Sequence, residues 1–217
     1  MIEIIDLYDL THTIAGEYLG GFKYPWEALA GISGLIIKLG EKLGDGYIKI
    51  AENVWVHKTA KIARSAYIGG PAIIGAGTEV RHCAFIRGSA LVGENCVVGN
   101  STELKNVILF DGVQVPHYNY VGDSILGYKA HMGAGSITSN VKSDKTPVVI
   151  HAEEDILTKL KKVGAFLGDF AEVGCNSVLN PGTVIGRNTS VYPLSSVRGV
   201  VPPDSIYKAK GNVITKG

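Results

Sequence analysis

The chain of 217 residues carries 21 Lys and Arg against 20 Asp and Glu, a balance that gives no reason to expect a nucleic-acid or anionic-membrane partner. With 46% hydrophobic and 19% charged residues, it is too apolar for wholesale disorder. Its 28 glycines are about twice the usual share of roughly 7%, yet they follow neither the three-residue period of collagen nor the serine-rich composition of a linker. Such a chain is expected to turn often and tightly around a core.

The first residues and the cysteines indicate the compartment. Residues 1–6 have no basic residue ahead of their apolar residues, so they lack the pattern of a secretory signal. The longest apolar run, residues 28–37, is about half the length of a membrane span. Three cysteines (Cys83, Cys96 and Cys175) without C-x-x-C spacing argue against a disulfide framework and a zinc site. We therefore expect a cytoplasmic protein with neither a metal nor a membrane partner.

Residues 1–46 form an apolar N-terminal segment that ends in an expected helix. The run from Leu35 to Leu43 has the composition of a helix, and Gly44 follows it as a C-terminal stop. A repeat region begins directly after this segment, and a solenoid needs its open end covered. We therefore expect residues 1–46 to be an N-terminal cap.

Residues 47–201 contain a six-residue repeat. An apolar residue recurs every six positions at Ile50, Val56, Ile62, Ile68, Ile74, Val80, Ile86, Val92, Val98, Leu104 and Phe110. Near Pro116 the register shifts by two residues, and it continues at Tyr120, Leu126, Met132 and Thr138. An insert at 141–166 follows, in which residues 153–162 are expected to form a helical turn or two. The repeat then resumes from Leu167 to Val197.

A period of six matches neither the 3.6 residues of a helical turn nor a long alternating strand. It suits a short strand and a two-residue corner, with the aliphatic side chain inward, a small residue at the inner corner and glycine at the turn. Three units close one triangular coil, and stacked coils pair edge to edge. We therefore predict an all-β protein, a parallel β-helix of about seven coils, followed by a tail at 202–217.

Arg87 and Lys105 are separated by three of the six-residue units, which make one full coil. They are therefore expected on one face, with their strands about 4.8 Å apart. Two stacked cations repel each other, and a bound phosphate would compensate them. The alternative is a charge ladder that Glu103 and Glu79 neutralise, and the spacing alone leaves both interpretations open.

His117 is located at the register shift, where a side chain can leave the wall of a solenoid and face a groove. A neutral imidazole takes up a proton near pH 7, so His117 is a candidate general base for an attacking amine. Glu103 is a candidate to orient it, as an acid does for a catalytic histidine. A lone histidine in a loop is usually just solvated, so the neighbouring motifs carry the weight.

Four motifs in residues 80–140 occur with the same spacing in one enzyme family. They are Phe85-Ile-Arg-Gly, Glu103-Leu-Lys, His117-Tyr-Asn-Tyr-Val-Gly-Asp and Met132-Gly-Ala-Gly-Ser-Ile-Thr-Ser-Asn140. Through them the chain resembles the hexapeptide-repeat acyltransferases. Residues 80–140 closely resemble the glucosamine-1-phosphate N-acetyltransferase domain of bifunctional UDP-N-acetylglucosamine pyrophosphorylase/acetyltransferases, and they also resemble its archaeal sugar-1-phosphate relatives. The resemblance covers about residues 50–200 and implies a left-handed parallel β-helix.

The resemblance implies roles for residues on the acceptor side. The phosphate of an amino sugar phosphate would be held by Arg87, Lys105 and Tyr120. The amine would lose its proton to His117, which Glu103 would orient. The further substrate-side positions are His131, Asn140 and Lys145.

The co-substrate that the resemblance implies is acetyl-CoA, with no metal. Its thioester would lie near Ala134, and the positions expected to contact it further along are Cys175, Pro193, Lys208 and Lys210. Cys175 as an acyl-carrying nucleophile is an alternative, but no basic partner is evident beside it, and a small buried residue is the expected role. Family members are trimers with sites between neighbouring β-helices, so a homotrimer is expected.

We predict an acetyl-CoA-dependent N-acetyltransferase that acts on a hexosamine 1-phosphate, either glucosamine or galactosamine 1-phosphate, in amino-sugar nucleotide metabolism. The nucleotidyltransferase domain of the family has no counterpart in residues 1–46, so the chain is not expected to make a UDP-sugar by itself.

Two alternatives stay open. One is a non-catalytic β-helix that binds a sugar nucleotide or regulates a partner, because three positions depart from the bacterial pattern: Val141, Thr146 and Cys175. The other is a metal-dependent hydrolase of the carbonic anhydrase type, with ligands drawn from His82, His117 and His131. The separation of His82 from His117 is not a whole number of coils, which argues against such a metal site.

Overall fold

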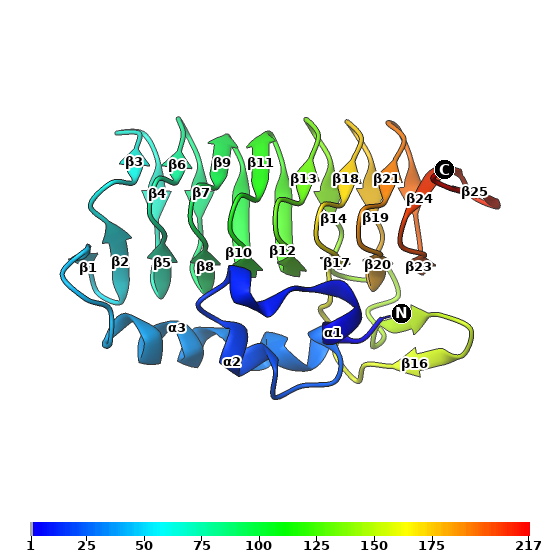
Figure 1. Cartoon of the computed structure of the whole chain (residues 1–217), viewed down its shortest axis with the longest axis horizontal. Helices are drawn as coiled ribbons and strands as arrows, with labels where there is room; N and C mark the ends of the chain where they lie inside the picture. The colour runs from blue at the N-terminus through cyan, green and yellow to red at the C-terminus, as the bar shows by residue number, and fades with distance from the viewer. Residues whose placement is uncertain (1) are drawn as a thin grey trace.

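The computed structural model describes residues 2–217. The repeat folds into stacked triangular coils, with a helical segment along one side (Figure 1). The predicted left-handed parallel β-helix is thus confirmed, and two of its faces each stack eight parallel strands in the described part of the chain. Each backbone N–H and C=O on a strand bonds to the coil before or after it, which satisfies the polar groups of a chain with such short strands.

The strands form three faces, each named here for what lies on it. The covered face consists of β2 (Val54–His57), β5 (Ala72–Ile74), β8 (Ala90–Val92), the second halves of β10 (Glu103–Leu109) and β12 (Tyr120–Leu126), β17 (Ala165–Leu167), β20 (Thr183–Ile185) and β23 (Val200–Val201). The Arg87 face consists of β4 (Tyr67–Ile68), β7 (Phe85–Ile86), the first halves of β10 and β12, β14 (Ile137–Thr138), β19 (Val178–Leu179) and β22 (Ser196–Val197).

The third face, the His131 face, consists of β3 (Lys61–Ile62), β6 (Glu79–Val80), β9 (Val97–Asn100), β11 (Gln114–His117), β13 (His131–Met132), β18 (Glu172–Val173), β21 (Ser190–Val191) and β24 (Ser205–Ala209). An antiparallel strand ends the solenoid on each side, β1 (Tyr47–Ala51) against β2 and β25 (Asn212–Thr215) against β24. The first part of the expected tail therefore belongs to the last coil. Strands β2 and β24 are thereby paired on both sides, whereas β3, β4, β22 and β23 end their faces with one partner each.

The repeat does lose two residues, but not near Pro116, where we predicted the register shift. Ile74 pairs with Val92 after three full units, but the pairings of Val92 with Leu109 and of Leu109 with Leu126 each span one residue fewer. The pairing of Ile86 with Leu104 still spans three full units, so the first residue is lost between Leu104 and Leu109. The second is lost between 121 and 126. Two corners are therefore one residue short, and they contain Asn106 and Asp123.

This change of register alters which side chains point inward. Val121 is completely buried, whereas Tyr120, which the six-residue period predicted to point inward, is partly exposed. Both short corners place a residue in the left-handed region, Asn106 at φ 56° and Asp123 at φ 49°. Asn and Asp tolerate this conformation better than other residues with a side chain.

We expected the N-terminal segment to cover an end of the solenoid, and this prediction is wrong. The segment lies along the covered face (Figure 1). Its helices are α1 (Ile4–Leu7), η1 (Leu10–His12), α2 (Gly16–Leu19), η2 (Pro25–Gly31) and α3 (Ile32–Gly40). Helix α3 contacts β5, β8 and β10, and η2 contacts β12. The helix expected to stop at Gly44 ends at Gly40. No helix within residues 2–217 is long and apolar enough to cross a membrane.

The covered face needs this segment because its strands are apolar on both sides. The middle residues of β5, β8 and β17 point out of the solenoid, and Ile73, Leu91 and Phe166 are nevertheless 0–1% exposed. The ring of Trp26 lies 6.0 Å from that of Phe166. Burial of such side chains is worth about 1.5–3 kcal/mol each, so the hydrophobic effect fixes the segment on this face.

A buried carboxylate also anchors the segment. Asp169 accepts hydrogen bonds from the backbone N–H of Asp9 (2.7 Å) and of Tyr128 (2.8 Å), and it pairs with Arg187. Its side chain is completely buried. A buried charge requires such partners, and the bond to Asp9 thereby ties the N-terminal segment to a corner of the solenoid.

The insert forms a hairpin and not the helical turns that we predicted for residues 153–162. Strand β15 (Val149–His151) pairs antiparallel with β16 (Asp155–Leu157). The backbone N–H of Val163 bonds to the carbonyl of Asn140 (3.0 Å) and closes the base of the excursion. Residues 164–166, which were assigned to the insert, already belong to the solenoid.

The position of the N-terminal segment predicts that an outward side chain on the covered face behaves as core. Phe166→Ala is expected to lower the free energy of unfolding by about 3–5 kcal/mol, as for other buried phenylalanines. Phe85→Ala is the matched control, because Phe85 also points outward but is 42% exposed on the Arg87 face. Urea denaturation of both variants measures the difference, and equal small losses would contradict the packing described here.

Candidate active site

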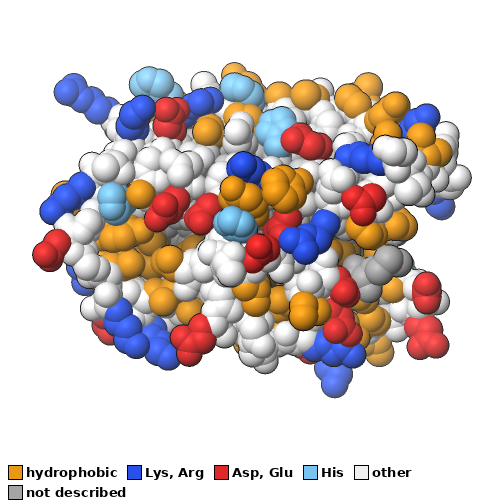
Figure 2. Space-filling model, in the orientation of Figure 1, with side chains coloured by type: hydrophobic (Ala, Val, Ile, Leu, Met, Phe, Trp, Pro, Cys, Tyr) orange, Lys and Arg blue, Asp and Glu red, His pale blue; other side chains and the backbone are white. Residues whose placement is uncertain are grey.

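One edge of the solenoid, between the His131 face and the Arg87 face, brings most of the predicted donor-side residues into one column. The residues of this His117 edge are His82, Asn100, His117, Ala134, Cys175 and Pro193, one from each successive coil. Backbone hydrogen bonds hold the column together, for example from Gly135 N–H to the His117 carbonyl (2.9 Å) and from Asn176 N–H to the Ala134 carbonyl (2.8 Å). Neighbours in such a ladder are about 4.8 Å apart. Figure 2 shows histidine and hydrophobic side chains along this upper edge of the molecule.

The separation of His82 from His117 is a whole number of coils, contrary to what we predicted from the six-residue period. His117 pairs with Asn100, and the Ser101 N–H bonds to the His82 carbonyl (3.2 Å). His82 and His117 are therefore two coils apart on the same edge, because the intervening coil is one residue short. Within residues 2–217, however, no group of three or more His, Cys, Asp and Glu side chains is arranged to hold a metal ion.

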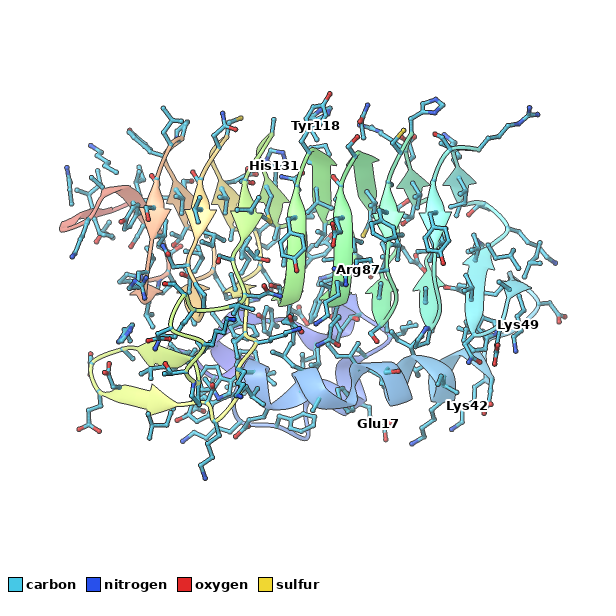
Figure 3. All side chains as sticks on the ribbon, turned by 180° about the vertical axis from the view of Figure 1, so that it is seen from behind. Glu17, Lys42, Lys49, Arg87, Tyr118 and His131 are labelled. Atoms are coloured by element: carbon cyan, nitrogen blue, oxygen red, sulfur yellow. The ribbon has the colours of Figure 1, made fainter. Side chains whose placement is uncertain are left out.

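His117 ends strand β11, and its side chain is exposed at the edge. Tyr118 follows in the left-handed region at φ 52° and is 63% exposed, at the rim that Figure 3 shows above Arg87. The backbone N–H of His117 donates to the side-chain oxygen of Asn119 (3.1 Å). A left-handed residue between two fixed ones turns the chain sharply, and this turn presents His117 to the solvent.

Asn119 is a functional candidate that we did not predict from the sequence. It is 2% exposed, and its Nδ2 donates to the carbonyls of Gly133 (2.9 Å) and Ser136 (3.0 Å). It therefore ties the His117 corner to the corner that holds Ala134. The sequence did contain a signal for Asn119. The inner-corner position, four residues after the inward aliphatic residue, is occupied by a small residue on most coils, and here it is asparagine.

Glu103 does not pair with His117. Its carboxylate accepts from Arg87 Nη1 at 2.8 Å, and the two side chains are 32% and 47% exposed. Strand β10 places Glu103 opposite Tyr120 on one side and Phe85 on the other, within the Arg87 face. The predicted orientation of the imidazole by Glu103 is therefore absent from this structure.

Lys105 is also paired with an acid, and the acid is one that the sequence analysis did not single out. Its Nζ lies 2.8 and 3.0 Å from the two oxygens of Asp123. Asp123 is 3% exposed. Glu79, which we considered as the neutralising residue, instead pairs with Lys61 and Arg81 on the His131 face. Both stacked cations are therefore paired with acids, Arg87 with the expected Glu103 and Lys105 with Asp123 in place of Glu79.

Tyr120 and Asn140 complete the cluster around Asp123. Asn140 Nδ2 donates to Asp123 Oδ2 (2.6 Å) and to the Tyr120 hydroxyl (3.2 Å). Burial, reinforced by the nearby Asp123 carboxylate, raises the pKa of Tyr120 above its usual value. The hydroxyl therefore stays protonated and able to donate to an anion. The Arg87 face thus joins four of the predicted acceptor residues (Arg87, Lys105, Tyr120 and Asn140).

Two predicted acceptor residues lie apart from this cluster. His131 is on the His131 face, where its Nδ1 lies 2.8 Å from Glu172 in a hollow also lined by Gln114 and Lys129. Lys145 belongs to an exposed turn, in which its backbone N–H bonds to the Lys142 carbonyl (3.0 Å). Figure 3 shows His131 higher on the molecule than Arg87.

On the donor side, Cys175 is exposed, so the small buried role that we expected for it is wrong. The corner turns its side chain outward, as it does that of His117 at the same position of the column. Lys208 and Lys210 are exposed at the last coil. The Lys208 ammonium lies 6.0 Å from the ring centroid of Tyr192, next to Pro193, and so extends the His117 edge by one coil.

The network around Asn119 generates a prediction about stability. Asn119→Ala leaves two buried carbonyls without this donor and is expected to cost about 1–3 kcal/mol. Ser177→Ala is the matched control, because Ser177 occupies the same inner corner two coils later and donates one bond, to the Tyr192 carbonyl (3.1 Å). Thermal or urea unfolding compares them, and an Asn119 variant no less stable than the Ser177 variant would contradict the bridging role.

Comparison with known proteins gives the chain its relatives. A family model described as the GMPPB C-terminal domain matches residues 70–158. The bifunctional protein GlmU of Methanococcus maripaludis strain C5 is 31% identical over 218 residues, which cover 99% of this chain and 53% of that protein. The bifunctional sugar-1-phosphate nucleotidylyltransferase/acetyltransferase of Sulfurisphaera tokodaii is 32% identical over 147 residues, 67% of this chain and 37% of that protein. The chain spans about half the length of the first of these relatives.

Solved structures with a similar fold are more distant. A hexapeptide transferase family protein from Anaplasma phagocytophilum shares 18% identity at a TM-score of 0.42, over 76% of this chain and 80% of that one. The acetyltransferase domain of PglB from Neisseria gonorrhoeae FA1090, in complex with acetyl coenzyme A, shares 16% sequence identity at a TM-score of 0.35. The match covers 75% of this chain and 57% of that one. The coiled repeat, its motifs and the sequence relatives together show that the chain is related to the GlmU-like bifunctional proteins, which it matches along almost its whole length.

Proposed function

We propose that the chain transfers the acetyl group of acetyl-CoA to the amine of a hexosamine 1-phosphate. The observation that carries the proposal is the proximity of two groups of residues across one corner. His117 ends β11 on the His117 edge, and Tyr120 begins β12 on the Arg87 face after a two-residue turn. A base for the amine and donors for a phosphate therefore flank the same corner. One relative is named a bifunctional sugar-1-phosphate nucleotidylyltransferase/acetyltransferase, which agrees with this substrate class.

The residues of the Arg87 face would bind the acceptor. Arg87 and the protonated hydroxyl of Tyr120 are donors suited to a phosphate, and Asn140 adds an amide close to Tyr120. Holding the sugar in place in this way supplies much of the rate enhancement, because the amine is then fixed against the thioester.

His117 would act as the general base. The amine nitrogen attacks the thioester carbonyl carbon and loses its proton to the imidazole, the C–S bond breaks, and the leaving thiolate of CoA takes that proton back. Backbone N–H groups of the corner at Ala134 would stabilise the oxyanion. The Gly135 N–H already bonds to the His117 carbonyl, which fixes this corner beside the base.

The donor would lie along the His117 edge. From Ala134 the pantetheine arm would pass Cys175 and Pro193 towards the lysines of the last coil. Lys208 and Lys210 are positive, as contacts for the phosphates of CoA should be. A homotrimer and a cytoplasmic location, both expected from the sequence, remain part of this proposal.

A second candidate function has one specific observation in its favour. Arg87 and Lys105 are already neutralised by Glu103 and Asp123, and His117 is not oriented by the carboxylate expected for it. A site with satisfied cations and an unoriented histidine suits a β-helix that binds a sugar nucleotide without turning it over. Turnover with any acceptor separates the two functions.

The proposed base is tested by His117→Ala. Removal of a general base is expected to lower kcat about 10²–10⁴-fold for transfer to glucosamine 1-phosphate. A thiol reagent that detects released CoA measures the rate. His82→Ala is the matched control, a histidine two coils away on the same edge, and it should keep the wild-type rate. Full activity in His117→Ala would refute the mechanism, and no turnover by the wild type with either hexosamine 1-phosphate would favour the binding protein.

A further inference from the structure

Asp123 is the buried acid of the Arg87 face, and the proposed reaction gives it no task. Its two oxygens accept from Lys105 Nζ (2.8 and 3.0 Å), from Asn106 Nδ2 (2.9 Å) and from Asn140 Nδ2 (2.6 Å). Its side chain is 5% exposed. A carboxylate with a cation and two amides around it is a fully satisfied charge. The four side chains therefore form one fixed unit.

The two ion pairs of this face differ in exposure. In the Lys105–Asp123 pair the side chains are 27% and 5% exposed, and in the Arg87–Glu103 pair they are 47% and 32% exposed. Separating the first pair would leave a carboxylate buried without its cation, which is strongly unfavourable. Separating the second pair exposes both groups to water at little cost. An incoming anion can therefore displace Glu103 from Arg87 far more easily than it can displace Asp123 from Lys105.

The backbone conformation at two corners of the solenoid allows the Asp123 unit to form. Asn106 and Asp123 occupy equivalent corners of consecutive coils, and these are the two corners that are one residue short. Both residues adopt left-handed backbone conformations. The short corners turn both side chains onto the Arg87 face, where Lys105 and Asn140 meet them. The departure from the repeat thus creates a buried acid next to the acceptor residues.

We infer that Asp123 is the positioning residue of the acceptor site, and that Arg87 and not Lys105 takes up the anion of the acceptor. This inference rests on the proposed function and deepens it. Lys105 and Asn140 are held by Asp123, and Asn140 in turn holds the Tyr120 hydroxyl. The charges of Arg87, Lys105, Glu103 and Asp123 cancel, so the phosphate of the acceptor binds by replacing the Glu103 carboxylate on Arg87.

Two variants of the cations test which of them binds the acceptor. Arg87→Gln should raise the KM for glucosamine 1-phosphate tenfold or more and leave Tm unchanged. Arg81→Gln is its control, because Arg81 also pairs with an exposed glutamate (3.2 Å to Glu79) but lies on the His131 face. Lys105→Met should lower Tm by at least about 5 °C and raise KM less than threefold. A tenfold rise in KM in Lys105→Met with an unchanged Tm would overturn the inference.

The positioning role of Asp123 needs a readout beyond stability. Asp123→Asn should lower Tm and also reduce kcat/KM about tenfold, because Asn140 and Tyr120 lose their support. Asp169→Asn is the control, since Asp169 is an equally buried acid that pairs with a cation on the next coil, Arg187. It should lower Tm with kcat/KM unchanged. If Asp123→Asn behaves in the same way as this control, Asp123 is structural only and the inference is wrong.

Binding measurements keep the inference separate from the proposed reaction. If the wild type acetylates no amino sugar phosphate, the proposed function fails, and calorimetry with inorganic phosphate then judges the assignment of the cations. Loss of phosphate binding in Arg87→Gln, with binding retained in Lys105→Met, supports it. The reverse pattern, or no phosphate binding by the wild type, overturns it.

Discussion

The backbone hydrogen bonds between successive coils are the interaction on which the rest of this structure depends. Each coil must pair its N–H and C=O groups with the next, so residues one coil apart are forced into the same column. The spacing of residues along the chain therefore decides which side chains become neighbours. His117, Ala134 and Cys175 follow one another along an edge because their backbones are paired. The outward residues of one face are apolar, Ile73, Leu91 and Phe166 among them, and the N-terminal segment buries them. The solenoid thus determines both the position of the candidate site and the position of its helical cover.

The candidate site depends on two small exceptions to this regularity. Each of two corners is one residue short, and these corners hold Asn106 and Asp123. Shortening a corner changes the direction of its side chain, which places a carboxylate within 2.8 Å of Lys105. Between these two corners the chain also passes the turn that exposes His117. The turn with His117 and Tyr120 is therefore within one stretch of irregular coil, whereas the coils before it keep three full six-residue units, as from Val56 to Ile74 and from Ile74 to Val92.

The sequence predicts the fold well because the six-residue period is set by covalent spacing and burial. It also identifies the column of donor positions and the cluster of Arg87, Lys105, Tyr120 and Asn140. It fails where partners are chosen by side-chain direction: Glu103 pairs with Arg87 and not with His117, and two single-residue shortenings look like one shift near Pro116. The strands of the covered face did carry a signal, since Ala72-Ile-Ile and Ala165-Phe-Leu have an apolar residue at the outward position. The insert hairpin has no such signal, because its pairing depends on contacts with the solenoid.

In the proposed function, the His117 edge binds the acetyl donor while the Arg87 face binds the acceptor. A crystal structure of the protein with acetyl-CoA and glucosamine 1-phosphate would show the positions of both ligands. We expect the thioester beside Ala134, the acceptor amine within hydrogen-bonding distance of the His117 imidazole, and the phosphate on Arg87 with Glu103 displaced. Acetyl-CoA bound away from the column of Ala134, Cys175 and Pro193, or a phosphate held elsewhere than on the Arg87 face, would contradict it.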